Sequence, residues 1–162
     1  MPAEARLAEL GIALPPVPAP AGAYVPAVVS GSLVYTAGQL PFVEGDLPAT
    51  GKVGARGETG AGSDLVSPDA AYELARVAAI NALAAARSVL GSLDRVTRVV
   101  KVVGFVASDP AFTGQPGVIN GASELLGEVF GGSAGAHARS AVGVAVLPLD
   151  SPVEVELVLE FE

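Results

Sequence analysis

Residues 68–90 carry the strongest structural constraint in the sequence. Ser67-Pro68-Asp69 supplies a helix N-cap, a proline at the first helical position and an early acid, and Gly91 supplies a stop. A rotation of about 100° per residue separates polar from apolar side chains. The polar side holds Asp69, Glu73, Arg76 and Arg87, and the opposite side holds Ala71, Leu74, Ala78, Ala85 and Val89. Because the apolar side is mostly alanine, we expect this helix to dock closely on a sheet.

The rest of the chain predicts that sheet. Apolar spacing over 116–130 indicates a second helix, and Ser30-Gly31-Ser32 is typical of a short hairpin turn. The expected strands are 25–29, 33–36, 95–107, 138–147 and 153–161. The order ββαβαββ predicts one α+β domain over residues 1–162, with two helices packed on one face of a mixed or mostly antiparallel sheet.

Two segments fall outside this pattern. A short helix is expected over 3–10, and the prolines from residue 15 to residue 20 favour polyproline geometry, so residues 1–20 are expected to form a surface arm. Residues 44–66 hold six glycines and few bulky side chains, which is typical of a long loop. Such a loop either carries function or is an insertion without one.

Composition narrows the possible functions. With 51% hydrophobic and 16% charged residues the chain is expected to fold, and prolines interrupt its longest uncharged stretch, which argues against a membrane-spanning helix. A net charge of -8 disfavours nucleic acid as a partner. Without cysteine, and with His137 alone, no thiolate or multi-histidine metal site is expected. The N-terminus lacks a signal-peptide pattern, so a cytoplasmic location is expected.

Arg139 is the strongest candidate for a binding residue. In the expected strand at 138–147 the even positions are the bulky packing face, whereas Ala141, Gly143 and Ala145 share the face of Arg139. The guanidinium is therefore expected beside open space, where it could bind a carboxylate through two parallel hydrogen bonds. The alternative is an arginine paired with a surface acid.

Glu154 belongs to a set of glutamates that alternate with apolar side chains over 153–161, which is usual for a solvated sheet face. If the last two strands form a simple hairpin, paired residue numbers sum to about 299, which puts Glu154 near Ala145 and roughly 20 Å from Arg139 in one chain. A site that uses both residues would then need two subunits.

Three further residues are weaker candidates. Tyr24 follows a turn and supplies either a site hydroxyl or packing, and Asn120 is either a cap-like or a buried amide. His137 is either an acid or base near neutral pH or an exposed histidine. The glycine run at 51–62 lacks the spacing of a P-loop, so nucleotide binding is not expected.

Three segments carry a recognisable motif. Residues 22–26 are Gly-Ala-Tyr-Val-Pro, residues 33–41 are Leu-Val-Tyr-Thr-Ala-Gly-Gln-Leu-Pro, and residues 137–148, His-Ala-Arg-Ser-Ala-Val-Gly-Val-Ala-Val-Leu-Pro, precede Val-Glu-Val-Glu at 153–156. Together they resemble the RidA/YjgF family of reactive intermediate deaminases. The resemblance implies a chorismate mutase-like α+β fold, assembled as a homotrimer with a pocket at each subunit interface.

The resemblance also implies a reaction and its residues. Family members hydrolyse enamines and imines such as 2-aminoacrylate, so 2-imino and 2-keto carboxylic acids are the expected ligands, and no cofactor or metal is implied. By position, Arg139 matches the arginine that holds the substrate carboxylate, and Glu154 matches the glutamate that places or activates water. The further matching pocket positions are Tyr24, Gly38, Asn120 and Ala141.

Departures from the family pattern leave other functions open. Ala37 stands where many members carry serine, Ala141 where many carry cysteine, and the 44–66 loop is longer than in the best-known members. The alternative function is a non-catalytic trimer that binds a small carboxylic acid or a partner protein as a regulator. Ribonuclease or translation inhibitor, labels also given to family members, fits poorly with the acidic charge and the absence of an aromatic stacking platform.

Overall fold

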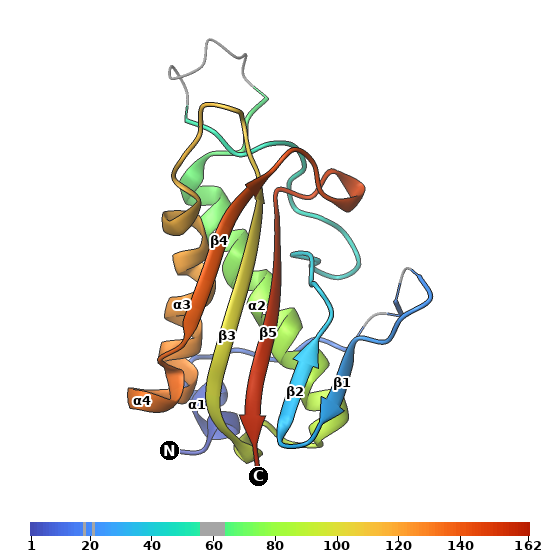
Figure 1. Cartoon of the computed structure of the whole chain (residues 1–162), viewed down its shortest axis with the longest axis vertical. Helices are drawn as coiled ribbons and strands as arrows, with labels where there is room; N and C mark the ends of the chain where they lie inside the picture. Colours follow the sequence, from blue (N-terminus) through green and yellow to red (C-terminus); the bar gives the residue numbers. More distant parts are fainter. Residues whose placement is uncertain (18, 21, 56–63) are drawn as a thin grey trace.

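The computed structural model describes residues 1–17, 19–20, 22–55 and 64–162, with helices packed on one face of a sheet (Figure 1). The strands are β1 Ala27–Ser30, β2 Leu33–Thr36, β3 Val96–Ala107, β4 Ala138–Val144 and β5 Val153–Phe161. The helices are α1 Ala3–Glu9, α2 Pro68–Leu90, α3 Gln115–Phe130 and the short α4 Gly132–Gly135. The expected α+β architecture is confirmed. None of the helices among the described residues combines the length and apolarity needed to cross a membrane.

The sheet is mixed, with the strand order β1-β2-β5-β3-β4. Only β3 and β4 are parallel, and the other neighbouring pairs are antiparallel. The expected hairpin between the last two strands is wrong, because β3 lies between β4 and β5. Helix α3 connects β3 to β4, and such a crossover returns the chain in the direction of the first strand. The register used to separate Arg139 from Glu154 is therefore wrong as well.

Small residues bring the layers close together. On α2, Ala71, Ala75, Ala78, Ala82 and Ala85 are fully buried. A Cβ on Gly104 of β3 would overlap the Ile119 side chain, and a Cβ on Gly121 of α3 would overlap the Tyr72 carbonyl of α2. The expectation for α2 fails only at Val89, which is 42% exposed, because the buried stripe of the last turn runs through Ala86 and Leu90 instead.

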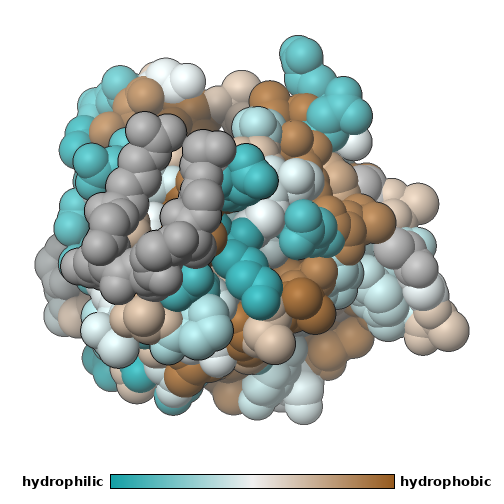
Figure 2. All heavy atoms as spheres, turned by 90° about the horizontal axis from the view of Figure 1, so that it is seen from above, coloured by the Kyte–Doolittle hydropathy of each residue, from teal (hydrophilic) through white to brown (hydrophobic). Residues whose placement is uncertain are grey.

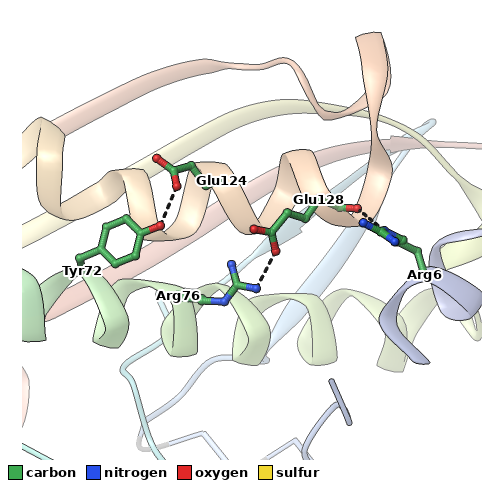
Figure 3. Close-up of polar contacts among 5 residues, drawn as sticks. All are labelled: Arg6, Tyr72, Arg76, Glu124 and Glu128. Atoms are coloured by element: carbon green, nitrogen blue, oxygen red, sulfur yellow. Dashed lines mark hydrogen bonds and ion pairs between the residues drawn. The ribbon is translucent and has the colours of Figure 1, made fainter. Parts of the chain in front are cut away.

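Polar contacts join α2 and α3 on the outside of this layer (Figure 3). The Tyr72 hydroxyl donates to Glu124 at 2.7 Å, which is the main reason the pKa of that hydroxyl is raised above 10.0. Arg76 pairs with Glu128 at 2.6 Å, and the Arg6 Nε–H of α1 donates to the Glu128 carbonyl at 3.0 Å. These exposed contacts add little stability individually, so the buried alanine face does most to hold the layer.

The two segments outside the strand and helix pattern are more firmly held than expected. In α1, Ala3 and Leu7 are buried in the core, and Leu14 packs against it, so the first part of the arm belongs to the folded body. Within the predicted 44–66 loop, Val53 is fully buried and its N–H donates to the Ala107 carbonyl at 2.7 Å. Val53 thus makes an isolated parallel bridge with Ser108 beside the end of β3, and the described part of the segment contains no helix or strand. Residues 56–63 of that loop lie outside the described residues.

The sheet face away from the helices carries exposed apolar side chains. Val28, Tyr35 and Val142 are 50%, 41% and 44% exposed, and Tyr35 lies between the buried Val34 and Thr36. Val28 pairs with Tyr35 in the sheet. We call this the open face of the sheet. Seen from above in Figure 2, exposed hydrophobic atoms also lie among hydrophilic ones at the upper end of the molecule, the end that carries the 148–150 turn in Figure 1. Apolar side chains on both faces are typical of a sheet that is covered on both sides.

Candidate functional site

Glu154 is a carboxyl residue with an unusual environment. It occupies a position of β5 between the buried Val153 and Val155, so its side chain lies on the open face, where it is partly buried. Burial raises the pKa of the Glu154 carboxyl above its ordinary value of 4.5, and the neighbouring charge of Glu156 raises it further. A carboxyl with a raised pKa is suited to accepting and returning a proton near neutral pH.

Gly38 leaves room for that carboxyl. A Cβ at this position would overlap the Glu154 Oε1 atom, so any larger residue would displace the side chain. The next residue, Gln39, exchanges backbone hydrogen bonds with Val155 at 2.8 and 3.0 Å, which holds the 37–40 segment against β5. Asn81 of α2 also holds this part of the chain, since its side-chain amide donates to the Leu40 and Phe42 carbonyls.

A cavity of about 720 Å³ opens beside Glu154 and Gly38. Tyr24, which is half exposed, lies in its wall, so the structure brings together three of the sequence-predicted site residues. The other walls come from residues 15–17 and 19–20 of the arm, from the 38–45 segment and from the 148–150 turn. Among the described residues that line the cavity, the charged ones are Glu44 and Glu154, and none is basic.

Arg139 lies elsewhere, between β4 and α3. Its Nη1 donates to Asn120 Oδ1 at 2.8 Å and to Ser123 Oγ at 3.2 Å, and its Nη2 donates to the Pro116 carbonyl at 3.2 Å. Each of these acceptors is neutral, and no carboxylate of the described residues forms an ion pair with Arg139. The guanidinium is thus fixed in place while its charge stays available for an anion.

The expected open space along β4 is wrong. Arg139, Ala141 and Gly143 face α3 rather than a pocket, and Ala141 packs against the core, because the parallel crossover places α3 over these positions. The expected packing face is instead exposed at Val142. Ala37, the other departure from the family pattern, sits beside Gly38, and its N–H donates to the Pro26 carbonyl at 2.7 Å.

Within one chain Arg139 and Glu154 face opposite sides of the sheet. Arg139 of β4 pairs with Val102 of β3, which pairs in turn with Leu157 of β5. Val102 and Leu157 are buried against the helices, so Arg139 lies on the same side of the sheet as they do. Glu154 is in register with Phe105, on the open face. The described residues of one chain therefore form two half-sites: a carboxyl with a cavity but no cation, and a cation with no acid.

The sequence did not predict that Ser123 and His137 help to hold Arg139 in place. The His137 Nδ1–H donates to the Gly135 carbonyl at 2.7 Å, and its Nε2 lies within hydrogen-bond distance of the Ser123 hydroxyl, at 2.9 Å. Ser123 in turn accepts from Arg139. The available signal was the three-residue spacing of Asn120 and Ser123, which puts both on one helix face.

Several known proteins are similar to this chain in sequence and in fold. Residues 4–161 match the family described as "YjgF/chorismate mutase-like, putative endoribonuclease". Protein TCP17 of Trypanosoma cruzi is 44% identical over 156 residues, which cover 96% of this chain and 92% of TCP17. The structure of Atu1372 from Agrobacterium tumefaciens, a protein of unknown function, is 42% identical with a TM-score of 0.84 and covers 99% of this chain and 94% of its own. Escherichia coli TdcF, solved with bound serine, is 23% identical with a TM-score of 0.63, over 90% and 94% of the two chains.

Proposed function

Because the chain belongs to the YjgF/chorismate mutase-like (RidA) family, we propose that it is an enamine and imine deaminase. It hydrolyses 2-aminoacrylate and related 2-imino acids to 2-keto acids and ammonia. Arg139 of one copy holds the substrate carboxylate, and Glu154 of a neighbouring copy acts on the attacking water. Tyr24 and Gly38 line the Glu154 side of the site, and Asn120 orients the guanidinium.

The observation that carries the proposal is that the acidic Glu154 and the basic Arg139 lie on opposite faces of the sheet. The Glu154 cavity has no basic residue among its described lining, so by itself it offers a carboxylate ligand no positive charge. Arg139 has no acid partner in the described residues, and it lies on β4, an edge strand of the sheet. The two half-sites complement each other when two copies meet, and one chain alone cannot join them.

The reaction requires little of the protein. The enamine takes up a proton at its terminal carbon to become an imine, whose C2 is already electrophilic. The water oxygen forms a bond to C2 while Glu154 accepts a proton from that water. Glu154 returns that proton to the nitrogen and the C2–N bond breaks, so that ammonia leaves. The hydroxyl proton passes to solvent as the 2-keto group forms, which balances the proton taken up by the enamine carbon. Anchoring, water placement and one proton relay are therefore sufficient.

The homotrimer is part of the proposal and has its own support. The open face exposes Val28, Tyr35 and Val142 in one layer, and burying such side chains gives about 25 cal/mol per Å² of apolar surface. A second and third copy of the chain would cover this face and bring the edge strand β4 of one copy toward the cavity of another.

The test is hydrolysis of 2-aminoacrylate released by a pyridoxal phosphate-dependent dehydratase, followed as appearance of the 2-keto acid. We expect the purified protein to accelerate it and Arg139→Ala to lose at least about a hundredfold in kcat/KM, because a charged hydrogen-bond pair to the carboxylate is removed. The matched control is Arg76→Ala, which removes an exposed arginine from α2 and should leave the rate unchanged. Binding of a 2-keto acid without any turnover would contradict the deaminase and favour a regulator.

A further inference from the structure

In one copy of the chain, before a neighbouring copy contributes Arg139, the cavity beside Glu154 is larger and more apolar than a three-carbon imine requires. Its volume of about 720 Å³ falls within the roughly 300–1,000 Å³ of sites that enclose drug-sized ligands. Water placement and carboxylate anchoring occupy only the Glu154 end. The rest of the lining is mostly apolar, with large apolar side chains from Val17, Leu40, Phe42 and Leu149. The polar side chains in this part of the described lining are those of Tyr24, Gln39, Glu44 and Asn81.

Leu149 is the most informative of these wall residues. Its backbone has φ 57° and ψ 22°, in the left-handed region where asparagine, aspartate or glycine would be less strained. It is also 66% exposed, so nothing in the described part of the chain compensates for its placement by packing. A branched apolar side chain held at such a position indicates a contact made outside the chain itself.

The turn that carries Leu149 is held firmly. The Asp150 carbonyl accepts from the Gly51 N–H at 2.8 Å, and the Asp150 N–H donates to the Leu147 carbonyl at 3.1 Å. Ser151, directly after the turn, is fully buried and donates to the Val153 carbonyl at 2.8 Å. The leucine is therefore presented at the cavity by a fixed backbone.

A second wall is also preformed. Ile12 and Leu14 pack against the core and anchor the chain just before Pro15 and Pro16. Proline has a fixed φ, so this wall loses little conformational freedom when a ligand binds. A cavity lined by this anchored apolar segment and by Leu149 is suited to a hydrocarbon or aromatic group.

We propose that this part of the cavity is a side-chain subsite for large apolar substituents. The preferred ligands are 2-imino acids, and their 2-keto products, with branched aliphatic or aromatic side chains such as those derived from leucine and phenylalanine. The subsite rests on the proposed function, since Arg139 of a neighbouring copy must hold the carboxylate. Glu44 and Glu154 are the charged groups of the described lining, so acidic side chains are disfavoured.

Binding of stable 2-keto acids tests the subsite without relying on turnover. By calorimetry we expect 4-methyl-2-oxopentanoate and phenylpyruvate to bind at least tenfold more tightly than pyruvate, because each buried methylene typically contributes a factor of several. Leu149→Asp, which suits the left-handed backbone and should fold, is expected to bring this ratio close to one. Val89→Asp changes a valine on α2 outside the cavity and should leave the ratio unchanged. Equal binding of small and large keto acids by the wild type, or a ratio unaffected by Leu149→Asp, overturns the subsite.

Turnover separates this proposal from the function on which it rests. An L-amino-acid oxidase supplies the 2-imino acids of alanine, leucine and phenylalanine, and semicarbazide traps whatever the protein has not hydrolysed. Higher kcat/KM for the leucine and phenylalanine imines supports the subsite, and equal acceleration of all three overturns it while the deaminase stands. If no imine is hydrolysed faster, the deaminase fails, and the calorimetric ratio still decides whether the subsite exists.

Discussion

Glu154 combines two properties on the central strand β5. It alternates with core residues as a solvated glutamate would, yet it is partly buried because Gly38 and the cavity walls close around it. Burial disfavours its charged form, which is the main cause of its raised pKa. A water-activating base must be ionised, so the raised pKa sets the lower pH limit of the proposed reaction.

The pH profile of kcat/KM should show this limit. Turnover by the wild type is expected to fall as the pH decreases through the raised pKa of Glu154, above the 4.5 of an ordinary carboxyl. Glu154→Gln cannot accept the proton and should lose roughly 10²–10⁴-fold with no acid limb from this group. The measurement is the rate of imine hydrolysis, corrected for the uncatalysed reaction, from about pH 4 to about pH 8.

Glu156→Gln is the matched control for that profile. Its carboxylate raises the pKa of Glu154 by charge repulsion, so its removal should move the acid limb to lower pH and leave the plateau rate in place. An acid limb that stays in the wild type at the value of an unperturbed glutamate, or that survives in Glu154→Gln, contradicts the role of this residue.

At the scale of the elements, the close approach of α2 and α3 depends on single glycines. The sequence predicts both helices almost to the residue, because N-cap, proline and glycine signals are local. It gives no indication of which glycine lies at the contact. The structure places Gly121 against the Tyr72 backbone, whereas a methyl group added at Gly127, six positions later on the same helix, would have no neighbour within 4 Å.

Alanine substitutions at these two glycines should have opposite effects on stability. Gly121→Ala is expected to lower the free energy of unfolding by about 1–3 kcal/mol, because backbone must move away from the new methyl group. Gly127→Ala should raise it by roughly 0.5–1 kcal/mol, because an exposed helical glycine loses conformational freedom on folding. Urea unfolding followed by circular dichroism measures both, and a neutral Gly121→Ala would mean that the helices are not in close contact there.

At the scale of the whole molecule, we expect the open face to form the contact between copies and the site to need residues from two copies. One substitution on that face should therefore change both the assembly and the activity. Val142→Asp puts a charge on the open face at 44% exposure, and Val89→Asp puts the same charge on α2 at 42% exposure. We expect the first to break a trimer of about 48 kDa, three copies of 16.0 kDa, and to abolish activity, and the second to change neither. Light scattering measures the mass of the assembly, and the imine assay measures the activity. A wild type that scatters as one copy while remaining active would overturn the divided site.

Mixing two inactive variants tests the same arrangement from another side. Arg139→Ala and Glu154→Gln, unfolded together and refolded, would give mixed trimers in which roughly a quarter of the sites hold both native residues, as random pairing requires. Activity near that fraction is expected. No recovery, with trimers formed normally, would show that both residues act within one chain.

The sequence by itself determined the elements of this protein, and the tertiary structure decided how they are paired. Caps, glycine stops and hydrophobic periods are local, so they predicted α2, α3 and the five strands. Strand pairing depends on which surfaces pack together over long separations, and the crossover through α3 placed β3 between β4 and β5. That placement turned Arg139 toward α3 and away from Glu154, a result that no spacing in the sequence encodes.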